Sequence, residues 1–213
     1  IYAYTGSGSG GASINHGLGG TPGLVIYKKR TGSTSSWQVY HQSLGGTKYM
    51  NLDEATDEYT SDSTRFGGTD PTSTTITLGT HANSAHNVIV YAWCDVPGLQ
   101  KFGKYTGNGS TDGPFIELGF KPAVLIYKRT DSDQPWYIID VKRDKINVAY
   151  HLISPDSNAA EETGSSPVID LLSNGFKPRA SYATINANGG TYIYMAWAEA
   201  PASNLFGGQS NAR

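Results

Sequence analysis

Residues 102–130 read FGKYTGNGSTDGPFIELGFKPAVLIYKRT, and this stretch decides the fold because an earlier part of the chain has nearly the same sequence. Its YTGNGS, at 105–110, matches YTGSGS at 4–9, and its LGFKPAVLIYK, at 118–128, matches LGGTPGLVIYK at 18–28. Each copy has a short strand, a glycine-rich turn and a strongly apolar strand that is entered through a proline. The sequence therefore predicts a tandem duplication.

The tryptophans extend this duplication along the chain. Trp37 and Trp136 begin equivalent strands, and Trp93 and Trp197 end equivalent strands. The offset between the copies drifts by a few residues, as insertions confined to turns would produce, because turns tolerate changes of length and strands do not. The expected divisions are two repeats and a C-terminal tail: 1–98, 99–201 and 202–213.

The composition predicts an all-β protein. The chain has 26 glycines and 14 tyrosines, and only 16% of its residues are charged. This mixture suits half-buried strands joined by tight turns, and it disfavours helices. Each repeat has enough strand candidates for a small antiparallel β-sandwich of jelly-roll or immunoglobulin size. We expect two such sandwiches in tandem, each with its own core; one larger, merged sandwich is the alternative.

Charge and hydropathy exclude several classes of partner. The formal net charge is −2, with both signs interspersed, so the chain has no basic stripe of the kind that binds nucleic acid. No apolar run approaches the ~20 residues that span a bilayer. We therefore expect neither nucleic-acid binding nor membrane insertion. Cys94 is the single cysteine, so no intrachain disulfide is possible.

The glycine-rich segment Gly6–Gly11 matches the dinucleotide-binding pattern G-x-G-x-x-G. That pattern works only where its last glycine opens a helix, and the residues that follow here are too rich in glycine to form one. We expect a hairpin turn. The five histidines have no recognised ligand spacing and are expected to be exposed in loops: His16, His41, His81, His86 and His151. The sequence predicts no catalytic residue, no metal site and no cofactor.

Two groups of carboxylates leave a glycosidase open as an alternative, since such enzymes need only two facing acids. Asp140 and Asp144 flank a charged turn, and four acids are clustered between Asp53 and Glu58. Carboxylates on turns are ordinary, so polysaccharide hydrolysis is the second alternative function.

Aromatic side chains are the remaining candidates for binding. Duplicated aromatic positions usually report core packing. The sharper alternative is a carbohydrate-binding platform at the rim of the sandwiches, formed by Trp37, Tyr40, Trp136 and Tyr137. On this interpretation the chain is a module that binds glycans of a host cell surface.

Residues 105–115 and 119–131 resemble a repeat family found in proteins of marine tailed bacteriophages, and further similar segments include 136–144, 188–194 and 210–213. The resemblance implies a large, repetitive virion component, and it carries over no catalytic residue. We therefore expect a non-enzymatic structural or adhesive part of a phage-like particle, such as a tail fibre, a tail-associated protein or a capsid decoration. Such a part lies on the virion surface and contacts other virion proteins or copies of itself, so a homo-oligomer is expected.

Overall fold

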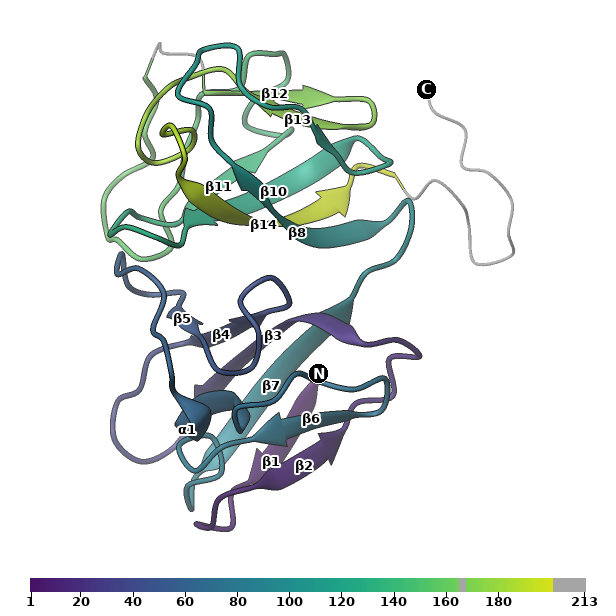
Figure 1. The fold of residues 1–213 in the computed structure, drawn as a ribbon, viewed down its shortest axis with the longest axis vertical. Coiled ribbons are helices and arrows are strands. Elements are labelled where there is room, and N and C mark those ends of the chain that lie inside the picture. The colour runs from purple at the N-terminus through teal and green to yellow at the C-terminus, as the bar shows by residue number, and fades with distance from the viewer. Residues whose placement is uncertain (165–167, 201–213) are drawn as a thin grey trace. The chain divides into compact units, whose positions relative to one another are not determined.

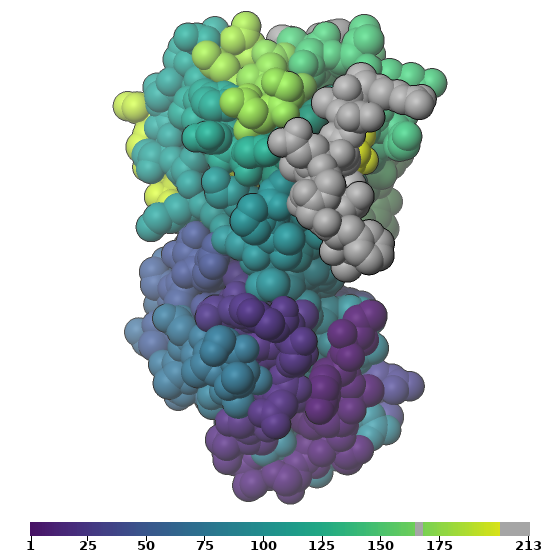
Figure 2. Space-filling view, turned by 90° about the vertical axis from the view of Figure 1, so that its right-hand side faces the viewer, coloured from purple at the N-terminus to yellow at the C-terminus, as the bar shows by residue number. Residues whose placement is uncertain are grey.

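A computed structural model describes residues 1–164 and 168–200, so the predicted tail at 202–213 lies outside the described residues. The chain divides into two compact units, Ile1–Asp95 (unit 1) and the part from Val96 onward (unit 2). In Figure 2 the purple-to-blue residues belong to unit 1 and the green-to-yellow residues belong to unit 2. Within the described ranges, no helix is long and apolar enough to cross a membrane.

Unit 1 contains two antiparallel sheets. The larger has the strand order β1-β7-β3-β4-β5. Its strands are β1 (Tyr2–Thr5), β3 (Pro22–Lys29), β4 (Gln38–His41), β5 (Met50–Asn51) and β7 (Asn87–Cys94). The smaller sheet pairs β2 (Ala12–Asn15) with β6 (Thr75–Leu78). Figure 1 shows the smaller sheet and the short helix α1 (Ser63–Phe66) over one face of the larger.

The described part of unit 2 also contains two antiparallel sheets. The larger has the order β11-β10-β14-β8, and the smaller has the order β12-β13-β9. The strands of the larger sheet are β8 (Gln100–Thr106), β10 (Pro122–Arg129), β11 (Tyr137–Asp140) and β14 (Thr191–Ala198). Those of the smaller sheet are β9 (Ile116–Glu117), β12 (Ile169–Leu172) and β13 (Gly175–Pro178). The predicted all-β class with antiparallel sandwiches is therefore confirmed (Figure 1).

The two units have the same strand order in their larger sheets, since β1-β7-β3-β4 corresponds to β8-β14-β10-β11. The pairing registers also correspond. Pro22 lies opposite Cys94 and Pro122 lies opposite Ala198, and in each unit the register shifts at the next residue of the strand. A duplicated chain would have this pattern, although common ancestry of the units itself stays a prediction. Unit 2 has the extra strand β12, whereas unit 1 has α1 beside the end of β6.

Each unit has its own apolar core. Because side chains alternate between the faces of a strand, every second residue of the central strands faces the smaller sheet. In unit 1 these residues include Val25 and Tyr27, and Phe66 of α1 packs edge-on against Tyr27 with ring centroids 5.4 Å apart. In unit 2 they include Leu125 and Tyr127. The chain thus closes two separate cores, as the repeated apolar strands predict.

Candidate functional site

The predicted aromatic platform is wrong for its two tyrosines, which lie in the cores. Tyr40 is 2% exposed and belongs to the core of unit 1, and Tyr137 is 7% exposed and belongs to the core of unit 2. Trp37 lies three positions before Tyr40, and Trp136 lies one position before Tyr137. Because side chains alternate along a strand, each tryptophan lies on the opposite face of its sheet from the tyrosine. Trp136 is buried and Trp37 is half-buried. The four side chains therefore form no common surface.

The predicted hairpin at Gly6–Gly11 is instead a connection between two sheets. The strand before it, β1, pairs with β7, whereas the strand after it, β2, pairs with β6. This crossing from one layer of the sandwich to the other requires long-range pairing, which a local turn pattern does not report. The segment is followed by a strand rather than a helix, so the geometry required for dinucleotide binding is missing there.

A buried asparagine in each unit binds the backbone of this glycine-rich turn. In unit 1, Asn83 Oδ1 accepts a hydrogen bond from Ser7 N at 3.2 Å, and Asn83 Nδ2 donates to Ser9 O. In unit 2, Asn186 Oδ1 accepts a hydrogen bond from Asn108 N at 2.9 Å, and Asn186 Nδ2 donates to the carbonyl of Ser110 at 2.6 Å. The same contacts therefore hold the same turn in both units.

The tyrosine and glycine of the repeated motif complete this arrangement. The hydroxyls of Tyr4 and Tyr105 donate to the carbonyl just before the asparagine, at 2.6 and 2.8 Å. A Cβ at Gly6 would lie 1.9 Å from the carbonyl oxygen of the residue that follows the buried asparagine, and a Cβ at Gly107 would lie 2.2 Å from the equivalent oxygen. Only glycine therefore fits at these two positions. We call the tyrosine, glycine and asparagine of each unit its turn clamp. The repeated motif thus has a structural role.

The tryptophans that begin equivalent strands have equivalent backbone partners. Trp37 N donates to Asp53 Oδ1 at 3.0 Å, and Trp136 N donates to Asp156 Oδ2 at 3.2 Å. Burial raises the pKa of the Asp156 carboxyl, against the lowering effects of the Trp136 amide and the Lys128 charge. Each aspartate thus ties a later loop to the start of the strand.

A lysine at the end of the central strand belongs to the same arrangement. Lys28 Nζ donates to the carbonyl of Ser35, and Lys128 Nζ donates to the carbonyl of Gln134, each in the loop before the tryptophan. The Lys28 ammonium also lies 5.5 Å from the centroid of the Trp37 ring. These repeated polar residues bind the backbone of their own unit, so we assign them to the scaffold.

The prediction that the histidines are exposed is wrong for all five, because His41 is buried and His16, His81, His86 and His151 are half-buried. His41 is fully buried, His81 Nδ1 lies 2.9 Å from the Tyr27 hydroxyl, and His151 Nδ1 lies 2.7 Å from Asp144 Oδ1. Burial lowers the pKa of His81 to about 4, with help from nearby positive charges. His41 belongs to strand β4, so it does not lie in a loop either. Within the described part of the chain, no cluster of three potential metal ligands is present.

The acidic cluster Asp53–Glu58 is also bound to its own unit. Glu54 accepts hydrogen bonds from Ser36 at 2.7 Å, from Asn51 at 2.7 Å and from Tyr59 at 3.0 Å. Burial would raise the pKa of Glu54, but these hydrogen bonds outweigh burial and lower it. Glu58 pairs with Lys48 at 2.5 Å. These carboxylates therefore organise a loop.

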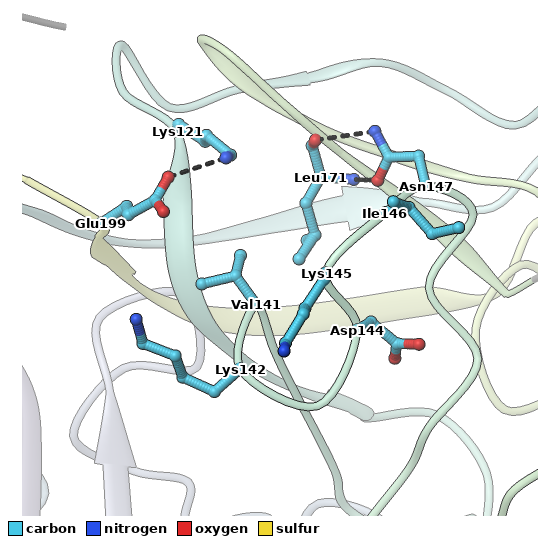
Figure 3. A pocket seen from close by; sticks show the side chains of 9 residues that line it. All are labelled: Lys121, Val141, Lys142, Asp144, Lys145, Ile146, Asn147, Leu171 and Glu199. Atoms are coloured by element: carbon cyan, nitrogen blue, oxygen red, sulfur yellow. Dashed lines mark hydrogen bonds and ion pairs between the residues drawn. The ribbon is translucent and has the colours of Figure 1, made fainter. Parts of the chain in front are cut away.

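Unit 2 contains a cavity of about 330 Å³, which lies beside the loop that follows β11 (Figure 3). Its lining combines three lysines and two acids with a few apolar side chains and one asparagine. The lining residues are Lys121, Val141, Lys142, Asp144, Lys145, Ile146, Asn147, Leu171 and Glu199.

Three short side chains fix the loop that forms one wall of this cavity. Asp140 Oδ1 accepts from the backbone amides of Lys142 and Arg143, at 2.9 and 3.0 Å. Asp144 Oδ2 accepts from the amides of residues 150 and 151. Asn147 exchanges two hydrogen bonds of 2.9 Å with the backbone of Leu171, as a neighbouring strand would. The loop is held at its beginning, middle and end, so its lysines project from a fixed backbone.

The charges around the cavity are unevenly neutralised. Lys121 forms an ion pair of 2.7 Å with Glu199. The Asp144 carboxylate is bonded to His151 and two amides, and Figure 3 shows it turned away from the ammonium groups of Lys142 and Lys145. Among the described residues, neither of these two lysines has a carboxylate within ion-pair distance. The cavity therefore has an excess of positive charge.

Sequence reasoning treated residues 140–144 as an ordinary charged turn and missed the cavity. A comparison of the two repeats contains the signal, because Lys121, Lys142 and Lys145 have no charged counterpart in the first copy. When Pro22 is aligned with Pro122, Lys121 corresponds to a threonine at position 21. When the tryptophans that begin equivalent strands are aligned, Lys142 and Lys145 correspond to a serine at position 43 and a glycine at position 46. The lysines are thus specific to unit 2.

The fold defines an all-β protein of two antiparallel sandwich units, one of which carries a cation-lined cavity. The chain belongs to the DUF7483 family, described as a domain of unknown function, which matches residues 1–201. This match includes both units, so the pair of sandwiches belongs to the family together. No curated protein and no solved structure matches the chain.

Proposed function

We propose that the chain is a non-enzymatic structural or adhesive component of a phage-like virion, exposed on the particle surface. One observation carries the scaffold part of this proposal: the polar residues that recur in both units bind backbone groups of their own unit. Asn83 and Asn186 hold the glycine-rich turns, and Asp53 and Asp156 hold the starts of equivalent strands. The repeated chemistry thus fixes loops, as a scaffold requires.

The virion part of the proposal is supported by the resemblance of segments 105–131 and 136–144 to the repeat family of marine tailed bacteriophages. Two linked, similar units also give one chain repeated surfaces, and weak contacts at such surfaces add through effective concentration. Capsids and tails place their parts at symmetric positions, so copies of this chain are expected to associate with one another or with other virion proteins.

The hydrolase alternative lacks the geometry that would favour it. Two carboxylates line the cavity of unit 2, but Asp144 is bonded to His151 and Glu199 to Lys121. In Figure 3 the two carboxylates lie on different sides of the cavity and do not face each other. A glycosidase places its acid pair on either side of one bond. Among the described residues, the lining of this cavity therefore does not offer that arrangement.

Immunogold electron microscopy tests the proposal. An antibody raised against the whole chain is applied to particles that have been purified from a lysate of the producing cells by density gradient. We expect gold at regular positions on intact particles, together with the chain in the protein profile of the same fraction. Confinement of the chain to the particle-free fraction of the lysate would overturn the proposal.

A further inference from the structure

The cavity of unit 2 has the features of a small binding site that is fixed in advance. Its volume of about 330 Å³ is at the lower end of the ~300–1,000 Å³ typical of small-molecule sites. Its wall is a loop held by Asp140, Asp144 and Asn147 through hydrogen bonds to backbone groups. A site whose backbone is already ordered loses little conformational entropy when a ligand binds.

The chemistry of the lining indicates an anion attached to an apolar body. Lys142 and Lys145 are exposed, and no described carboxylate pairs with either of them. Between the charged groups lie apolar side chains, Val141 and Leu171, and Ile146 beside them is 79% exposed. A free inorganic anion would use only the lysines. A sugar ring that bears an acidic group would use both, because its C–H face can pack on the apolar side chains.

We propose that this cavity binds an acidic sugar unit of a polysaccharide, with its carboxylate or sulfate ester between Lys142 and Lys145. Lysine suits such a ligand because its ammonium is a compact charge on a flexible stem that can follow either group. The inference rests on the proposed adhesive function, and it names the ligand class. Unit 1 lacks these lysines, so one site per chain is expected, and adhesion then depends on several copies of the chain in one particle.

Titration of the full chain tests the proposal by calorimetry and by NMR of backbone amides. Three tetrasaccharides serve as probes: one of uronic acids, one with sulfate esters and one neutral. We expect binding of at least one acidic probe and none of the neutral one, with the largest amide shifts at Val141, Lys145 and Leu171. The preferred acidic probe identifies the source of the anionic group. Shifts centred in another part of the chain, or equal binding of the neutral probe, would contradict the proposal.

Variants that remove single or paired charges test the role of the lysines. The double variant Lys142→Gln/Lys145→Gln is expected to weaken binding by about tenfold, because two charge-assisted contacts are lost. Lys104→Gln removes the same kind of charge from an exposed position of β8 that does not line the cavity, and it should leave affinity unchanged. Glu199→Gln releases Lys121 from its ion pair and should tighten binding.

Each outcome of these titrations is decisive. All four positions are exposed, so the variants should keep the melting temperature of the parent chain, and a melting scan checks this. An unchanged affinity of the double variant, or an equal loss in Lys104→Gln, overturns the proposed site. If the parent chain binds neither acidic probe, the site is also wrong. The microscopy of particles does not depend on this site, so failure here leaves the proposed virion function standing.

Discussion

Replacement of two equivalent tyrosines by phenylalanine should lower stability in one unit and leave it unchanged or raise it in the other. Tyr27 and Tyr127 lie at the same position of the central strand, and both are almost fully buried. The Tyr27 hydroxyl lies 2.9 Å from His81 Nδ1, whereas the buried Tyr127 hydroxyl has no hydrogen-bond partner within the described ranges. Phenylalanine keeps the ring and its packing in each case, so the pair isolates the hydroxyl.

The expected magnitudes follow from these partners. Tyr27→Phe removes one hydrogen bond and leaves the half-buried His81 without it, which should lower the free energy of unfolding by about 1 kcal/mol. Tyr127→Phe removes a hydroxyl whose burial without a partner costs ~1–3 kcal/mol in proteins. A small void is left in its place, so a gain between zero and about 1 kcal/mol is expected.

Hydrogen exchange followed by mass spectrometry, combined with urea titration, can assign the change to a unit. Peptides from residues 22–29 report on Tyr27, and peptides from residues 122–129 report on Tyr127. We expect earlier opening of the first set in Tyr27→Phe, and unchanged or later opening of the second set in Tyr127→Phe. An equal loss in the two variants would refute the reasoning, because it would mean that the Tyr127 hydroxyl has a partner.

Three further predictions concern the turns and pH. Asn186→Ala removes a fully buried side chain that binds the glycine-rich turn, and should lower the free energy of unfolding by about 3 kcal/mol in urea titrations. Gly107→Ala should lower it by about 2 kcal/mol, because its Cβ would meet a carbonyl oxygen at 2.2 Å; Gly164→Ala, whose Cβ would meet no atom of the described residues within 4 Å, is the neutral control. His81 has a pKa of about 4 in the folded chain, below its usual 6.5. The contribution of neutral His81 to the free energy of unfolding is therefore complete above pH 6.5 and is lost as pH falls towards 4. In melting scans this loss should be about 1 kcal/mol, after allowance for solvent screening, and absent in His81→Asn.

The sequence predicted the all-β fold class, because this class depends on regular patterns. Alternating and apolar strands repeat around Pro22 and Pro122, and the registers at these prolines correspond in the structure. The same alternation rule could have corrected the aromatic platform, because adjacent residues such as Trp136 and Tyr137 must point to opposite faces of a sheet.

Other features could not be predicted, because they depend on contacts between distant residues. The turn after β1 joins two sheets, and its buried partner Asn83 lies about eighty residues further on. The cavity of unit 2 arises from side-chain bonds to backbone groups, such as those of Asn147 with Leu171. Neither contact leaves a periodic signal. Comparison of the two copies shows which lysines are specific to one unit, but it does not show that a loop brings them together.

Hydrogen exchange at the two turn clamps tests most directly the claim that both units are built on one scaffold. In NMR spectra of the whole chain, we expect the side-chain amide protons of Asn83 and Asn186 to exchange slowly. The backbone amides of Gly6 and Gly107, which donate at 2.9 and 2.8 Å, should be protected as well as those of the neighbouring strands. Slow exchange in one unit with fast, loop-like exchange at the equivalent protons of the other would contradict the account.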